Sequence, residues 1–233
     1  MNIVGMSKIG LVRQRNEDRF YIEDSFAIVT DGMGGYKGGE IASTMVIDSL
    51  AQQLRNNPKP TVEQLKQYIN TANEEVFNRV KETPELEGMG TTVVVAYIHK
   101  NTLYWANVGD SRLYVLTDNS LKQISTDHSM VQALYEAGEL EKEDMINHPQ
   151  RNLLTRAVGV EPNVEVDGGL VELQPGDRIL LCSDGLTGYI SPERIEAEFQ
   201  QEPDNTRLVE DLMSLVYNEG AKDNVTIVVG TIE

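Results

Sequence analysis

Hydrophobic and polar positions along the chain follow two patterns, one typical of buried strands and one typical of amphipathic helices. Residues 91–98 are almost all apolar or β-branched, which predicts a strand buried on both faces. Similar runs occupy residues 25–30, 103–108, 112–116, 177–182 and 224–232. We expect 103–108 and 112–116 to pair as an antiparallel hairpin through Gly109-Asp110-Ser111.

Two long helices are predicted between the first strands. Residues 39–54 and 61–81 both carry apolar side chains at helical spacing, and Thr61 with Gln64 matches a capping box. Two further helices are predicted at 192–200 and 205–218. Because the first two helices are amphipathic, we expect each to pack on a sheet.

Residues 127–152 are polar and show no strand pattern. They predict one or two short helices joined by loops, inserted in an otherwise strand-rich order. One interpretation is a surface insertion. The other is a mobile flap beside a functional site, because loops on a rigid scaffold often carry function. The sequence leaves both open.

Composition narrows the class of protein. A chain of 233 residues with 40% hydrophobic content fits one domain spanning 1–233. The formal charge of −17 disfavours nucleic acid and anionic membrane surfaces as partners. The single cysteine, Cys182, lies in an apolar run and predicts a buried hydrophobe in a reducing compartment. With no signal pattern and no bilayer-length apolar segment, we expect a cytoplasmic protein, with a monomer as the default state.

Aspartates recur where apolar runs end. Asp31 and Asp184 each follow a predicted strand and precede glycine, Asp110 follows Val108-Gly109, and Asp223 immediately precedes another strand. Each Asp-Gly pair taken alone is best interpreted as a turn. Taken together, carboxylates at neighbouring strand ends can converge on one point, where repulsion is costly unless cations or protons neutralise it. With oxygen ligands only, the natural cations are Mg²⁺ or Mn²⁺.

Histidines and glycines give weaker signals. His99, His128 and His148 lack zinc-ligand spacing, and only His128, which follows Asp127, is a candidate for a substrate role. The glycines after Asp31 fit neither common nucleotide-binding motif, so that interpretation is rejected.

Six segments together resemble the PPM family, the type 2C metal-dependent protein serine/threonine phosphatases, and in particular its compact bacterial members. They occur in the family's order and spacing along the whole chain. The matching segments are Arg13-Gln14-Arg15-Asn16-Glu17-Asp18, Asp31-Gly32-Met33-Gly34-Gly35, Gly90-Thr91-Thr92, Val108-Gly109-Asp110-Ser111-Arg112, Cys182-Ser183-Asp184-Gly185-Leu186 and Asp223-Asn224-Val225-Thr226.

The resemblance implies an α+β fold, with a central β-sandwich of two antiparallel sheets flanked by pairs of helices and a flap inserted near 127–152. It also implies hydrolysis of phosphoserine and phosphothreonine in proteins by a metal-activated water. The expected cofactors are two or three Mg²⁺ or Mn²⁺ ions. The expected partners are phosphoprotein substrates, including a serine/threonine kinase and its targets.

By the same resemblance, Asp31 bridges two ions, the Gly32 carbonyl holds one of them, and Asp184 and Asp223 hold the second. Asp110 with Asp184 matches the ligands of a third, weaker ion. Glu17 and Asp18 bind metal directly or through its waters, and Arg13 grips the substrate phosphate.

One departure concerns the leaving group. Many eukaryotic members have histidine directly after the first Asp-Gly, where this chain has Met33. The proton for the leaving alkoxide is then expected from a metal-held water or from His128. Tyr36 stands where some relatives place a histidine near the substrate, so it is a candidate substrate contact.

Two alternatives stay open. One is a pseudophosphatase that binds phosphoproteins without turnover. The other is a phosphatase that acts on an anti-anti-sigma protein, a role weakened by the lack of a sensory domain.

Overall fold

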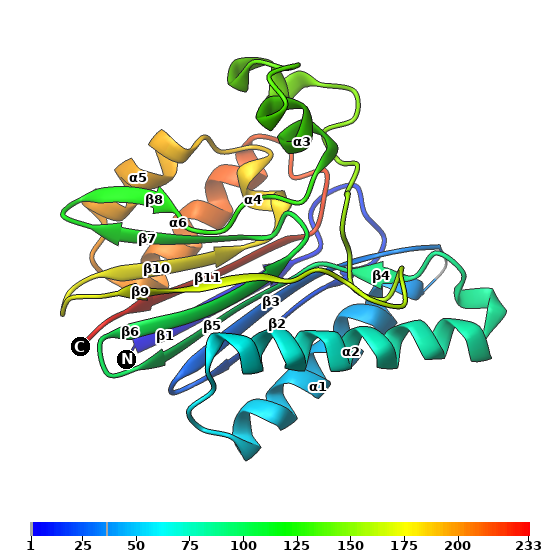
Figure 1. Cartoon of the computed structure of the whole chain (residues 1–233). Helices are drawn as coiled ribbons and strands as arrows, with labels where there is room; N and C mark the ends of the chain where they lie inside the picture. The colour runs from blue at the N-terminus through cyan, green and yellow to red at the C-terminus, as the bar shows by residue number, and fades with distance from the viewer. Residues whose placement is uncertain (1, 36) are drawn as a thin grey trace.

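The computed structural model describes residues 2–35 and 37–233, and two stacked antiparallel sheets form its centre. One sheet has five strands in the order β1-β11-β10-β7-β8. The other has six, with β2-β3-β5-β6-β9 in line and β4 beside β3. Helices cover the outer faces, so the layers run helix, sheet, sheet, helix (Figure 1). The α+β sandwich expected from the sequence is therefore confirmed.

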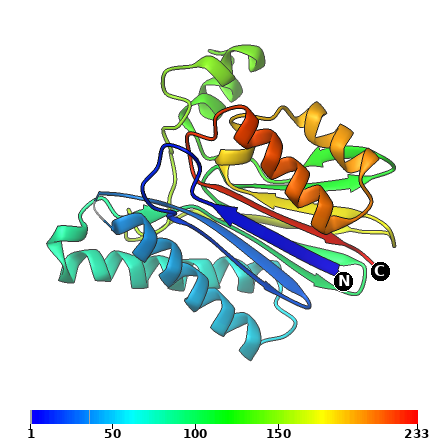
Figure 2. The same ribbon diagram turned by 180° about the vertical axis from the view of Figure 1, so that it is seen from behind.

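Each sheet collects strands from distant parts of the chain. The five-stranded sheet contains β1 (Asn2–Lys8), β7 (Arg112–Thr117), β8 (Ser120–Gln123), β10 (Arg178–Cys182) and β11 (Val225–Thr231). The six-stranded sheet contains β2 (Asp18–Glu23), β3 (Phe26–Met33), β4 (Gly90–Thr91), β5 (Val93–His99), β6 (Thr102–Val108) and β9 (Asp167–Glu172). The first strand, β1, pairs with the last, β11, along its whole length, and Figure 2 shows the two side by side.

The apolar core between the sheets explains why the central strands are apolar on both faces. Val29, Val94, Leu113, Leu181 and Val228 meet there with no exposed surface. The opposite faces of the same strands pack against helices, as the continuous apolar runs predicted.

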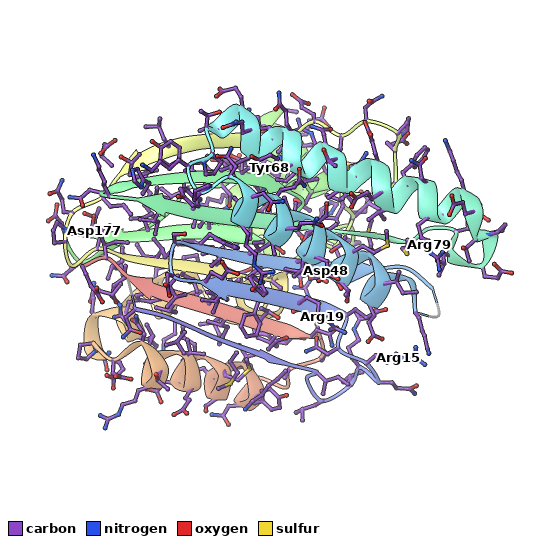
Figure 3. The ribbon with its side chains drawn as sticks, turned by 90° about the horizontal axis from the view of Figure 1, so that it is seen from below. Arg15, Arg19, Asp48, Tyr68, Arg79 and Asp177 are labelled. Carbon is purple, nitrogen blue, oxygen red and sulfur yellow. The ribbon has the colours of Figure 1, made fainter. Side chains whose placement is uncertain are left out.

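A first helix pair covers the six-stranded sheet. It consists of α1 (Gly38–Asn56) and α2 (Val62–Glu82), and the 3-10 turn η1 (Pro84–Leu86) follows α2. The predicted capping box is present, because the Thr61 hydroxyl accepts from the Gln64 N–H and the Gln64 side chain accepts from the Thr61 N–H. Figure 3 shows this layer from below, with Arg19, whose guanidinium contacts Glu40 of α1 at 2.9 Å.

A second helix pair, α5 (Pro192–Gln201) and α6 (Asn205–Asn218), covers the five-stranded sheet. Ser191 and Asp204 cap these helices, since each side chain accepts from a backbone N–H in the first turn. The short helix α4 (Asp184–Thr187) begins directly after β10. Packed helices therefore hold in place the segments that follow the ends of these strands.

The flap region contains α3 (Met130–Glu136) and the 3-10 turn η2 (Lys142–Asn147), which confirms the short helices predicted for 127–152. In Figure 1 this segment projects beyond one end of the sandwich. Its two ends are joined, because the Met130 N–H donates to Leu153 O at 2.8 Å and the Thr155 N–H to His128 O at 2.9 Å.

The expected hairpin between 103–108 and 112–116 is wrong. Strand β6 pairs with β5 and β9, whereas β7 pairs with β10 and β8 in the other sheet. The chain changes sheets at Gly109, whose φ of +102° and close approach to Thr92 exclude a Cβ. Both strands are apolar on two faces. That pattern fits two strands in different sheets as well as two strands paired in a hairpin.

Other differences between the predicted and the observed strands arise where the hydrophobic pattern is weak. Strands β1, β2, β8 and β9 were not expected, and their residues are mostly half-exposed. The strand predicted at 91–98 divides at Thr92 into β4 and β5. Among the described residues, no helix is long and apolar enough to cross a membrane.

Candidate functional site

A pocket of about 690 Å³ opens at one end of the sandwich, and most of the predicted site residues line it. They come from both sheets and from the connections between strands. Together they bring four aspartates, one glutamate and one arginine around a common space, as the sequence predicted. The predicted residues in its lining are Arg13, Glu17, Asp31, Gly32, Asp110, Asp184 and Asp223.

Asp31, near the end of β3, is fixed through its backbone. Its N–H donates to Thr92 Oγ1, and its carbonyl accepts from the Thr92 N–H and from Thr91 Oγ1, each at 2.9 Å. The Thr92 hydroxyl lies 2.6 Å from that of Ser111, the residue after Asp110. One hydroxyl network therefore sets Asp31 relative to the loop that carries Asp110.

Gly32 is required by close packing. Its N–H donates to Glu17 O at 3.2 Å, and a Cβ at this position would lie 2.1 Å from the carbonyl oxygen of Gly39. Only glycine lets α1 begin this close to the strand that carries Asp31.

Asn224 joins the two ends of the chain at the pocket. Its Nδ2 donates to Ile9 O at 3.0 Å and to Arg15 O at 2.8 Å, while its Oδ1 accepts from the Glu17 N–H at 2.8 Å. These bonds hold the loop carrying Arg13 and Glu17 against Asp223. The sequence pointed to Asn224 only as part of a motif, because nothing local reveals partners more than 200 residues away.

Arg13 and Asp223 form a two-point ion pair across the mouth of the pocket. Arg13 Nε lies 2.7 Å from Asp223 Oδ1, and Nη2 donates to Oδ2 at 2.7 Å. The hydrogen bond to Asp223 is the main reason that the pKa of Arg13 is raised. The Arg13 side chain is half exposed, so solvent and anions can reach it.

Asp18 lies on β2 opposite Asp31 and is almost fully buried. Its Oδ2 accepts from Ser183 Oγ at 2.7 Å and from Thr226 Oγ1 at 2.8 Å. Its Oδ1 has no hydrogen-bond partner among the residues that the structure describes. A buried acceptor without a partner is costly, and a bound cation or its water is one way to satisfy it.

Burial and mutual repulsion dominate the electrostatics of the pocket. Burial, followed by the charge of Asp184, raises the pKa of Asp18 to about 7. The pKa of Asp31 is raised well above its usual range, first by burial and then by the charges of Asp18, Asp184, Asp110 and Asp223. Burial also raises the pKa values of Asp110, Asp184 and Glu17. The pocket therefore favours protons or cations among its carboxylates.

The donor set fits hard divalent cations. Carboxylate oxygens and the Gly32 backbone supply oxygen ligands only, which suits Mg²⁺ and Mn²⁺. Within residues 2–35 and 37–233, no three acidic, histidine or cysteine side chains already enclose a point as a metal cage. The carboxylates share one pocket, and the Arg13 pair occupies both oxygens of Asp223.

His128 lies outside this pocket, in the wall of a neighbouring cavity of about 280 Å³. Its Nδ1 accepts from the Gly109 N–H at 3.1 Å, and its Nε2 lies 3.2 Å from Asp167 Oδ2. Burial lowers the pKa of His128, which favours the neutral ring. A substrate role for His128 stays a prediction. Met33 lines the main pocket, and Tyr36 lies outside the described residues.

Part of the pocket lining was not foreseen from the sequence. It comes from the segment after the flap, whereas the flap itself contributes only Asn152. No charge run or recognised motif marks this segment. Its residues in the lining include Leu153, Val160, Glu161, Val164 and Glu165.

Comparison with known proteins gives one consistent answer. The family model described as Protein phosphatase 2C matches residues 12–228. The serine/threonine phosphatase stp of Listeria welshimeri serovar 6b is 37% identical over 228 residues, which cover 94% of this chain and 90% of that protein.

Solved structures agree with the fold. The Mycobacterium tuberculosis serine/threonine phosphatase PstP superposes with a TM-score of 0.95 at 37% identity, covering 100% of this chain and 98% of that one. The catalytic domain of PstP solved with two manganese ions gives a TM-score of 0.90 at 34% identity, covering 100% and 98%. A relative with this fold therefore holds divalent ions.

Proposed function

Since the chain belongs to the protein phosphatase 2C family and is a metal-dependent protein serine/threonine phosphatase, we propose that its pocket carboxylates hold the ions and that Arg13 receives the substrate phosphate. The observation that carries this proposal is the gathering of Asp31, Asp110, Asp184 and Asp223 in one pocket. Their mutual repulsion makes the site receptive to cations.

Each carboxylate has a distinct place in this proposal. The charges of the other pocket aspartates all raise the pKa of Asp31, and we assign it as the ligand that two ions would share. Asp184 and Asp223 would hold the second ion, and Asp110 with Asp184 a third. Glu17 and Asp18 would bind ions directly or through water. When bound, the ions supply Lewis acidity that activates water and neutralises phosphate charge.

Arg13 binds and orients the phosphate. Its planar fork matches two phosphate oxygens, just as it now matches the two oxygens of Asp223. Its loop is held by Asn224, so the fork is placed before substrate arrives. The largest contribution expected of Arg13 is to stabilise negative charge on the equatorial oxygens of the phosphate.

The proton for the leaving alkoxide cannot come from Met33, which has none to give. His128 would have to exchange its present contacts with Gly109 and Asp167 before reaching substrate. Cys182 takes no part, because it is fully buried and its pKa is raised to about 12.

The cellular setting is also a proposal. We infer that the substrates are phosphoproteins, including a serine/threonine kinase and its targets, and that the chain works as one monomeric phosphatase domain in the cytoplasm. The unpaired, buried Cys182 supports a reducing compartment.

Hydrolysis of an aryl phosphate and of a phosphothreonine peptide with Mn²⁺ tests this function. Activity should vanish in excess chelator and return with Mn²⁺. Activity that persists unchanged in chelator contradicts the proposal.

A further inference from the structure

The pocket is larger than a phosphorylated side chain requires. A volume of about 690 Å³ is typical of pockets that enclose most of a small ligand. The proposed catalytic residues and most residues of segment 153–165 line this one pocket. Substrate residues beside the phosphorylated one therefore have further side chains in the same pocket to contact.

The surface of segment 153–165 combines apolar and acidic side chains with one basic side chain, Arg156, which pairs with Glu165 and Asp167. Leu153 and Val160 are 48% and 45% exposed, and Val164 is half-buried beside them. Glu161 and Glu165 lie in the same stretch and are both exposed. We call these five residues the 153–165 wall.

The two glutamates differ in their charge balance. Glu165 Oε2 lies 3.0 Å from Arg156 Nη2, so its charge is already offset. No hydrogen bond or ion pair to the Glu161 carboxylate is found in the described part of the chain. Glu161 thus leaves a free negative charge next to the exposed Val160.

The part of the wall that carries Val160 and Glu161 is rigidly held. Val158 and Thr91 exchange backbone hydrogen bonds at 2.9 and 3.0 Å, which ties the wall to β4. The fully buried Asn73 of α2 accepts from the Gly159 N–H at 2.7 Å and donates to Glu161 O at 3.0 Å. A surface fixed at both sides of Val160 binds with little ordering cost.

We propose that the 153–165 wall selects phosphopeptides that carry a bulky apolar residue and a basic residue on the same side of the phosphorylated one. The apolar side chain would contact Leu153 and Val160, and the lysine or arginine would meet Glu161. This inference rests on the proposed function and names its substrate class. It places selection in the segment after the flap and not in the flap helices.

The test uses phosphothreonine peptides of equal length that differ at two positions on one side of the phosphothreonine, with Leu or Ser at one and Lys or Glu at the other. Both sides are tried. The measured quantity is the ratio of kcat/KM between peptides within each variant, with Mn²⁺. The Leu/Lys peptide should exceed the Ser/Lys and the Leu/Glu peptides by roughly tenfold each.

Two substitutions should remove these preferences separately. Val160→Asp should abolish the preference for Leu, and Glu161→Lys should abolish or invert the preference for Lys over Glu. Matched controls are Leu170→Asp, an exposed apolar residue on β9, and Glu210→Lys on α6, which should leave both ratios unchanged. Binding of phosphonate analogues of the peptides, followed by fluorescence anisotropy, should show the same ratios.

The outcomes distinguish a failure of this inference from a failure of the proposed function. If neither aryl phosphate nor any peptide is hydrolysed, the proposed function fails and the inference fails with it. If peptides are hydrolysed at equal rates, or if Glu210→Lys shifts the ratio as much as Glu161→Lys, only the inference is overturned. A dimer that Val160→Asp dissociates, with unchanged peptide ratios, would also overturn it, because the wall would then be an interface between copies.

Discussion

Arg13 and Asp223 neutralise each other through two contacts of 2.7 Å at the mouth of the carboxylate pocket. The proposed function assigns a different partner to each, an ion to Asp223 and a phosphate to Arg13. To bind an ion, Asp223 would have to give up at least one of its two contacts with Arg13.

Replacing Arg13 by Ala should tighten Mn²⁺ binding several-fold, because a cation that competes for Asp223 is removed. The same change should lower kcat/KM by roughly 10²-fold, since the phosphate loses its fork. Calorimetric titration with Mn²⁺ and steady-state kinetics measure the two effects. Arg13→Lys is the control, because it keeps the charge but loses the fork. An unchanged Mn²⁺ affinity in Arg13→Ala would refute the competition.

Replacing Asp31 by Asn should reduce turnover by at least 10³-fold while making the metal-free protein more stable at neutral pH. Four neighbouring carboxylates raise the pKa of Asp31, so removing its charge relieves repulsion. Thermal unfolding with and without Mn²⁺ checks this. Without Mn²⁺ the variant should have a higher Tm than the original chain, and added Mn²⁺ should raise its Tm by less. A lower starting Tm would contradict the repulsion.

The stability of the metal-free protein should fall as pH rises from about 4 to about 7. The pKa of Asp18 is raised from 3.8 to about 7, so the folded state favours the protonated form. The stabilising contribution of Asp18 is complete below the pKa of its carboxyl in the unfolded chain. It is lost as the pH rises through the pKa of the same carboxyl in the folded chain. Urea denaturation across this window measures the fall, and Asp18→Asn should flatten it. Added Mn²⁺ should raise Tm more at pH 7 than at pH 5, because protons compete with the ion.

Asn73→Ala should destabilise the fold by roughly 2–4 kcal/mol, because it leaves the buried Gly159 N–H and the Glu161 and Pro162 carbonyls without their partner. Urea denaturation measures the loss. Thr71→Ala, an exposed change on the same helix, should stay within about 0.5 kcal/mol of the original chain. Equal losses for the two variants would show that Asn73 does not hold this segment.

Cys182 should resist thiol reagents in the folded protein. It is fully buried, and burial raises the pKa of its thiol to about 12, so thiolate is scarce at neutral pH. Titration with an aromatic disulfide should show reaction only after denaturation, with activity unaffected beforehand. Rapid labelling of the native chain would contradict the buried position.

Helical periodicity and apolar runs in the sequence predicted the main helices and the buried strands of the fold. The long helices α1 and α2 and the buried strands β3, β5 and β10 carry strong local signals, and each was expected within a few residues of its bounds. Which sheet a strand joins is not a local property. For that reason β6 and β7, separated by only three residues, were paired wrongly.

The same distinction applies to the site. Asp31, Asp110, Asp184 and Asp223 could be predicted because each stands at a recognisable strand end. The 153–165 wall could not, since its position depends on Asn73 and Thr91, which reach the segment from elsewhere in the fold. Ser183 and Thr226 likewise support Asp18 through contacts that span the chain.

The pairing of β1 with β11 has a consequence for biosynthesis. Arg13 and Asp223 are 210 positions apart, so a growing chain on the ribosome lacks Asp223 until nearly all other pocket residues have been made. Contacts of such separation close late and slowly. Enzymatic competence should therefore arise abruptly, after the last strand has left the exit tunnel, and incomplete nascent chains should release no phosphate.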